Sequence, residues 1–221
     1  MRKLLVILVF ILFGTVASAQ LKVDESLSFG YNRSYGVYTD DATMIDWRFH
    51  GGLDLRGGLR FHSVITGIEL GAKYYLNDNW GVEGFYTGQR SKEYGFREYN
   101  FGVLGVWNWR ERVEVRAGSF IKRLTPFKDK GGVWEPLNGA YSVKVWALNP
   151  ESRFNFAASL SNLDMFTAER FYCPMLTLRA QYYIFDGYLL YLSFREHNSG
   201  IFDLTSVRYD RQFRIGTVIT W

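Results

Sequence analysis

The chain has 221 residues, a formal net charge of +4, an aromatic content of 18%, 4 prolines and one cysteine. A single cysteine excludes an intrachain disulfide, and the scattered charges lack the block of like sign that marks a nucleic-acid surface. No linker or low-complexity tract interrupts the chain, so we expect one domain and no nucleic-acid partner.

The N-terminus has the pattern of a secretory signal peptide. Two basic residues at 2–3 precede an unbroken apolar run at 4–13, and residues 17–19 (Ala-Ser-Ala) fit a cleavage site. The apolar run is too short to span a bilayer comfortably. We therefore expect residues 1–19 to be removed and residues 20–221 to form the exported domain.

Beyond the signal, apolar and polar residues alternate with the period of a β-strand. Ile68, Leu70 and Ala72 share one face of such a segment, and Glu69 and Lys73 lie on the other. The alternating segments, in chain order, are 27–31, 67–76, 80–89, 98–109, 113–122, 141–147, 153–161, 176–184, 188–197 and 212–221. None of them approaches the ~20 apolar residues that a membrane helix requires. The alternation indicates an all-β chain.

Short turns and long connections follow one another between these segments. The tight turns lie around Asn77, Arg110, Pro150 and Asp186, and the long connections at 33–62, 90–97, 123–138, 162–170 and 198–209. Short turns at one end and long loops at the other are typical of outer-membrane barrels. We predict a closed antiparallel transmembrane β-barrel of about ten strands. Eight or twelve strands remain open, because residues 46–55 could hold a further hairpin.

The last twelve residues end the chain on an aromatic side chain. Phe213, Ile215, Ile219 and Trp221 share an apolar face, and the interleaved residues are small, polar or charged. This segment resembles the closing strand of bacterial outer-membrane β-barrels, whose terminal aromatic is read by the assembly machinery. The resemblance to these OmpA-like or porin-like barrels implies a Gram-negative-type cell outer membrane as the location. It also implies lipid, lipopolysaccharide, periplasmic chaperones and the barrel-assembly machinery as partners.

The polar faces of the predicted strands carry many charges, which a small barrel would place in its lumen. They are Glu69, Lys73, Glu83, Glu98, Glu114, Arg116, Lys122, Lys144, Arg153, Arg179, Arg195 and Arg214. Because unpaired charges in a narrow lumen are costly, we expect a connected ion-pair network that fills and rigidifies the barrel. The excess of basic residues leaves open a second interpretation, a narrow anion-preferring channel.

Candidate catalytic residues follow the penultimate strand. His197 and Ser199 resemble the base and nucleophile of the His-x-Ser-Asn motif of lipid A 3-O-deacylases, with Asp203 or Asp210 as the orienting acid. Gly200 stands where that motif has asparagine, which departs from the family at the oxyanion position. The resemblance implies a lipid A deacylase-like esterase.

We expect a non-enzymatic outer-membrane protein that has a structural role or binds a ligand through its extracellular loops. The three histidines have no metal-ligand spacing and no Gly-rich phosphate loop is present, so we predict no metal and no cofactor. The esterase and the narrow channel are the alternatives. The sequence leaves the ligand, the oligomeric state and conduction undetermined.

Overall fold

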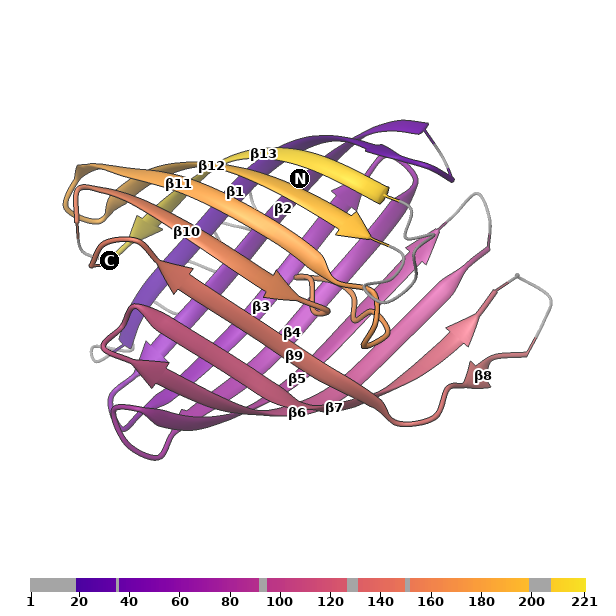
Figure 1. The fold of residues 1–221 in the computed structure, drawn as a ribbon, viewed down its shortest axis with the longest axis horizontal. Coiled ribbons are helices and arrows are strands. Elements are labelled where there is room, and N and C mark those ends of the chain that lie inside the picture. The colour runs from indigo at the N-terminus through magenta and orange to yellow at the C-terminus, as the bar shows by residue number, and fades with distance from the viewer. Residues whose placement is uncertain (1–18, 35, 92–94, 127–130, 150–151, 199–207) are drawn as a thin grey trace.

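The computed structural model describes residues 19–34, 36–91, 95–126, 131–149, 152–198 and 208–221. These residues form thirteen strands, shown in Figure 1. They are β1 (Ala19–Asn32), β2 (Gly36–Phe49), β3 (Leu53–His62), β4 (Ile65–Tyr75), β5 (Trp80–Ser91), β6 (Arg97–Trp109), β7 (Val113–Thr125), β8 (Val133–Trp134), β9 (Asn138–Trp146), β10 (Phe154–Ser161), β11 (Met175–Phe185), β12 (Tyr188–Asn198) and β13 (Arg208–Thr220). Within these ranges no helix is long and apolar enough to cross a membrane.

Twelve of the strands close into one antiparallel barrel. Each strand pairs with its neighbours along the chain, β7 pairs with both β6 and β9, and β13 pairs with β1 to close the ring. The two-residue strand β8 is an addition that pairs with the end of β7, where Trp134 lies opposite Arg123. The prediction of a closed antiparallel barrel is confirmed, but the preferred count of ten strands is wrong.

The two additional strands are β2 and β3, which lie in the segment predicted as a long first loop. The outward face of β2 carries Thr39, Asp41 and Thr43, and its inward face carries Ala42 and Met44. This distribution weakens the apolar-out, polar-in alternation by which the other strands were recognised. The pairing of β2 with β1 over fourteen residues, from Ala19 opposite Phe49 to Asn32 opposite Gly36, fixes it in the wall.

The barrel has a polar interior and an apolar exterior. Asn100 and Ser28 point inward and are fully buried, whereas Leu70 and Phe213 point outward with 49% and 65% of their surface exposed. An exposed apolar band around a polar lumen is the arrangement of a barrel whose outer face meets lipid. The predicted assembly-signal residues lie on this outer face of β13, where Ile215 is also exposed; Ile219 pairs with Val23, and Trp221 follows the strand.

The connections differ between the two ends of the barrel. One end, the turn end, holds the connections at 50–52, 76–79, 110–112, 147–153 and 186–187 together with the last residue. Arg110 and Glu111 have positive φ angles of 48° and 57°, as a tight hairpin requires. At the opposite end, the loop end, β1, β3, β5, β7, β10 and β12 end; the intervals to the next barrel strands are 33–35, 63–64, 92–96, 126–137, 162–174 and 199–207. The first two of these are short, so long connections do not occupy every position at the loop end.

Candidate functional site

The connection between β10 and β11, residues 162–174, crosses the lumen; we call it the inner loop. Phe166 at its tip has no exposed surface and packs with Ala42 and Met44 of β2. A Cβ atom added to Gly67 of β4 would lie 3.2 Å from the Cβ of Phe166, and one added to Gly58 would lie 3.4 Å from its ring. The wall opposite β10 and β11 therefore has a seat shaped for this ring.

Hydrogen bonds give the inner loop a defined shape. The Asn162 side chain donates to the carbonyls of Gly139 and Glu169, each at 2.8 Å, and accepts from the amide of Tyr141 at 2.7 Å. The amide of Asp164 donates to the carbonyl of Thr167 at 2.9 Å, which makes a tight turn at the tip. Satisfied buried backbone groups are expected of a loop that lies inside a barrel rather than over its surface.

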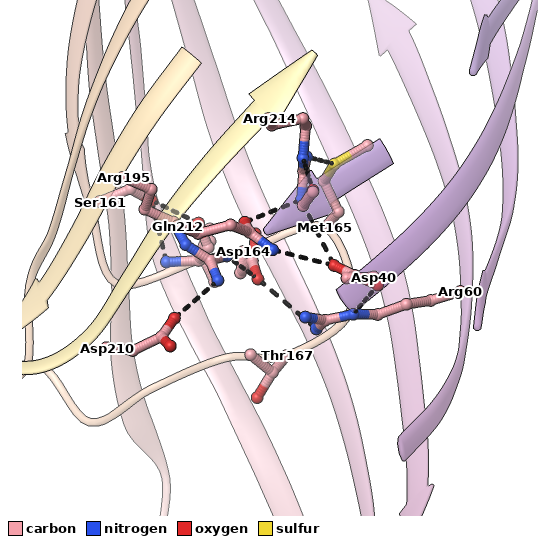
Figure 2. Close-up of polar contacts among 12 residues, drawn as sticks. Asp40, Arg60, Ser161, Asp164, Met165, Thr167, Arg195, Asp210, Gln212 and Arg214 are labelled. Atoms are coloured by element: carbon pink, nitrogen blue, oxygen red, sulfur yellow. Dashed lines mark hydrogen bonds and ion pairs between the residues drawn. The ribbon is translucent and has the colours of Figure 1, made fainter. Parts of the chain in front are cut away.

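The inner loop meets a group of charged and polar wall residues inside the lumen (Figure 2). This constriction cluster consists of Asp40, Arg60, Asp164, Arg195, Asp210, Gln212 and Arg214. Arg60 binds Asp40 at 2.9 Å between its Nε and Oδ1, and Arg195 binds Asp210 at 3.0 Å between its Nη2 and Oδ2. Gln212 donates to the other oxygen of Asp40 at 3.0 Å.

Asp164 brings a carboxylate from the inner loop into this cluster. Its Oδ2 accepts a hydrogen bond from Arg195 Nη1 and lies 4.0 Å from Arg60 Nη1. Burial alone would raise the pKa of Asp164, but the nearby guanidinium groups of Arg195, Arg60 and Arg214 outweigh it and hold that pKa below its usual range. The carboxylate is therefore charged in the cluster.

Three cavities follow one another along the lumen. The turn-end cavity has a volume of about 470 Å³, the loop-end cavity about 440 Å³, and a smaller middle cavity about 240 Å³. The middle cavity shares Lys144 and Arg179 with the turn-end cavity, and Asp164 and Arg195 with the loop-end cavity. The inner loop and the constriction cluster thus separate two larger spaces that open toward opposite ends of the barrel.

Most cations of the turn-end cavity are paired with carboxylates. Arg56 binds Asp46 at 2.7 Å, and Arg116 binds Glu114 at 2.9 Å. Lys73 lies 3.7 Å from the same Glu114. These ion pairs connect the lumen faces of β2, β3, β4 and β7, and they form the kind of network that offsets the cost of removing charges from bulk water.

Lys144 of β9 and Arg179 of β11 differ from these cations. Across the part of the chain that the structure describes, neither has a carboxylate within ion-pair distance. Lys144 lies over the ring of Trp146 at 4.3 Å and Arg179 over the ring of Tyr191 at 3.7 Å. The Arg179 Nε also has no hydrogen-bond acceptor there. This side of the cavity therefore presents basic groups that stand outside the ion pairs of the described residues.

The charges on the lumen faces of the strands are nearly balanced. Among the lumen-facing strand residues whose side chains the structure describes, eleven are cationic: Lys22, Arg48, Arg56, Arg60, Lys73, Arg116, Lys122, Lys144, Arg179, Arg195 and Arg214. Nine are anionic: Asp24, Asp40, Asp46, Asp54, Glu69, Glu83, Glu98, Glu114 and Asp210. The strands therefore contribute an excess of two positive charges, to which the inner loop adds the carboxyl groups of Asp164 and Glu169 and the exposed guanidinium of Arg170.

Most charges predicted for the lumen lie there, and several enter ion pairs. Glu69 lies 3.5 Å from Arg56, Glu83 lies 3.2 Å from Arg116, and Lys122 lies 3.3 Å from Glu98. Arg153 does not take part. It lies in the turn before β10 with its guanidinium over the outward-facing ring of Tyr182 at 5.4 Å, because the strand begins only at Phe154.

Sequence reasoning missed Asp40, Arg60 and Asp164, which form the centre of the constriction cluster. The first two lie on β2 and β3, and the third lies on a connection predicted to be external. A period-two series at Arg56, Gly58, Arg60 and His62 was the signal available for β3. No comparable local pattern indicates that a loop turns into the lumen.

The structure brings together only part of the predicted catalytic set. Ser199 and Asp203 lie outside the described residues. His197 lies opposite Asp210 in the pairing of β12 with β13. The Asp210 carboxylate accepts hydrogen bonds from Tyr38 at 2.9 Å and from Arg195 at 3.0 Å, which places it in the constriction cluster.

No protein-family model and no curated protein matches the sequence. Solved structures with a similar fold are outer-membrane porins and channels. A KdgM porin in complex with disordered oligogalacturonate aligns with a TM-score of 0.57 at 12% identity, covering 90% of this chain and 99% of the porin. The NanC porin aligns with a TM-score of 0.56 at 14% identity, covering 90% and 98%. The translocator domain of the autotransporter NalP from Neisseria meningitidis aligns at 0.55 and 12%, covering 100% and 94%. These similarities show the fold, that of an outer-membrane β-barrel.

Proposed function

We propose that this chain is an outer-membrane channel that prefers small anionic solutes. The observation that carries the proposal is the position of Lys144 and Arg179, which face the turn-end cavity without carboxylate partners. Uncompensated cations in a confined, low-dielectric space raise the local concentration of anions. A barrel that only stiffened the envelope would have no need of this uneven pairing.

The charge of the turn-end cavity supports the same interpretation. Its lining includes seven cationic side chains: Lys22, Arg48, Arg56, Lys73, Arg116, Lys144 and Arg179. It includes four carboxylates: Asp46, Asp54, Glu83 and Glu114. The resulting formal net charge of +3 lies in a space of about 470 Å³, which admits small solutes and not folded chains. The sheet places this charge on rigid strands, so it does not depend on a mobile segment.

The proposal is tested by the reversal potential of the purified full-length protein in planar bilayers under a KCl gradient. We expect channels with anion preference in the wild type. Replacing both Lys144 and Arg179 by glutamine should shift the reversal potential toward the cation value, because it removes the uncompensated charge. Arg153→Gln is the matched control. It also removes a positive charge, but from outside the lumen, so the selectivity should be unchanged.

Two results would contradict the proposal. The first is the absence of channels both in the wild type and in variants that release the inner loop, which would favour a structural or loop-binding role. The second is an anion preference that the Lys144→Gln/Arg179→Gln variant retains in full. Correct folding of each variant is checked beforehand by its heat-modifiable migration in gels, a property of closed barrels.

A further inference from the structure

The constriction cluster contains three arginines but only two carboxylates from the barrel wall. Arg60, Arg195 and Arg214 contribute three positive charges, and Asp40 and Asp210 contribute two negative charges. The third negative charge is that of Asp164, which arrives on the inner loop. Without Asp164 the wall has an excess of one positive charge at this point, which corresponds to one missing carboxylate.

The carboxylate of Asp164 lies against the arginines in the way that the carboxylate of a bound solute would lie. It sits at the tip of the loop, where the turn closed by the Thr167 carbonyl presents the side chain to the guanidinium groups of Arg195 and Arg60 (Figure 2). Planar guanidinium groups are suited to carboxylates, because their N–H donors match the two oxygens. The contact between the loop carboxylate and the wall arginines is a non-covalent ion pair. Another carboxylate can therefore take the place of the loop carboxylate.

One donor of the site is unused. Arg195 uses Nη1 for Asp164 and Nη2 for Asp210, while its Nε has no hydrogen-bond acceptor in the described part of the chain. The Arg195 side chain is only 11% exposed. A buried cation with an unused donor is costly unless a further acceptor reaches it. Asp164 offers only one oxygen to Arg195. The Nε of Arg195 is therefore left without an acceptor among the described residues.

The site is reached from both sides. Asp164 and Arg195 line the loop-end cavity and the middle cavity, and the middle cavity continues into the turn-end cavity through Lys144 and Arg179. A solute that moves along the lumen therefore meets the position of Asp164 whichever end it enters.

We propose that Arg60 and Arg195 form a carboxylate-binding site that Asp164 of the inner loop occupies, with Arg214 as a further positive charge nearby, and that a carboxylate-bearing solute exchanges with Asp164 during passage. This rests on the proposed channel function and names the solute class of that channel. Asp164 of the inner loop then competes with the carboxylate of the solute for the same arginines. The inner loop is held by the ion pair of Asp164, by the seat of Phe166 and by a hydrogen bond of 2.6 Å from Thr167 to Glu98.

The exchange predicts that removing the competitor strengthens binding. We would titrate gluconate, a small monocarboxylate, into the full-length protein in detergent and measure its dissociation constant by calorimetry. Asp164→Asn removes the charge and keeps the size of the side chain. It should bind gluconate about tenfold more tightly than the wild type, the ordinary size of a coupling between two competing interactions. The double variant Asp164→Asn/Arg195→Gln should lose that gain.

A reversible lock of the inner loop provides a second test. A Gly67→Cys/Phe166→Cys pair places two Cβ atoms close to the separation found in disulfides. A Cβ built on Gly67 lies 3.2 Å from the Cβ of Phe166. Cys173→Ser is introduced with the pair, so that no other thiol competes. The oxidised protein should bind gluconate more weakly than the reduced protein, because Asp164 cannot leave the site.

These outcomes separate the site from the channel. Equal gluconate affinities of the wild type and Asp164→Asn, or of the oxidised and reduced lock, would overturn the carboxylate site even if the protein conducts. Tighter binding by Asp164→Asn in a protein that forms no channels would support the site and overturn the channel function. Because binding is measured at equilibrium in detergent, neither result depends on conduction.

Discussion

Phe166 of the inner loop lies against Gly67 of β4, across the lumen from the strands that carry the loop. The distance between the Phe166 Cβ and a Cβ built on Gly67 is 3.2 Å, so a larger residue at position 67 would require Phe166 to shift by a few tenths of an ångström. A side chain from a connection is thereby inserted into the opposite wall. The diameter of the lumen at this level is set by a loop and not by the barrel alone.

Shortening the Phe166 side chain should widen the open part of the lumen. Phe166→Ala removes a fully buried aromatic side chain, and such a change costs about 3–5 kcal/mol in a packed site. We expect the loop and not the barrel to lose that stability, because Phe166 has no part in the strand pairing. Single-channel conductance should rise, and amide hydrogen exchange at residues 162–174 should accelerate while the strands stay protected. Unchanged exchange at the loop would show that Phe166 does not anchor it.

The inner loop should respond to pH through Glu169. Burial raises the pKa of Glu169 to about 7, Glu98 and Asp164 add to the rise, and Lys122 and Arg195 oppose it. The seated loop therefore holds a proton that a released loop, with an ordinary value near 4.5, gives up. The stabilisation of the seated loop by protonated Glu169 is complete below pH 4.5 and is lost as the pH rises to about 7.

Conductance should accordingly increase between these two pH values. Glu169→Gln, which is neutral throughout, should flatten the pH profile and keep the loop seated at neutral pH. Asp164 does not contribute in this range, because its arginine neighbours keep its carboxylate charged. A pH profile that survives in Glu169→Gln would assign the titration to another group.

Asn155 is expected to stabilise the turn end. Its fully buried side chain accepts from the amide of Leu148 at 3.0 Å and donates to the carbonyls of Leu148 and Asn149 at 3.1 and 2.8 Å. Asn155→Ala removes these hydrogen bonds, each of which contributes about 0.5–1.5 kcal/mol. Urea unfolding in lipid vesicles should show the loss. Ser159→Ala, which removes one polar atom on the same strand face, is the control and should have a smaller effect.

The parts of the fold that could be predicted depend on local alternation. The strand pair β4 and β5 was recognised because Ile68 and Leu70 face outward while Glu69 and Glu83 face inward, and a tight turn joins the strands. β2 was missed because Asp41 stands on its outward face and Met44 on its inward face, where it packs with Phe166. The inward position of Met44 is therefore explained by its packing against the inner loop, whereas the outward position of Asp41 is not.

The constriction cluster could be predicted only in part. Arg195 and Arg214 lie on strands with clear alternation and were assigned to the lumen, but the ion pair of Arg195 with Asp164 joins residues 31 positions apart. Such a contact depends on which way a connection folds. Local sequence carries no record of that choice, since Phe166 would read equally well as a surface aromatic of an external loop.

The most direct test of the channel is the uptake of two solutes of similar size and different charge. Liposomes containing the purified protein would be exposed to glucuronate or to glucose, and swelling rates would be compared with those of protein-free liposomes. An anion-preferring lumen predicts faster entry of glucuronate than of glucose, with a larger difference in Asp164→Asn. Equal entry of the two solutes, faster entry of glucose, or no uptake above the protein-free rate would contradict the account.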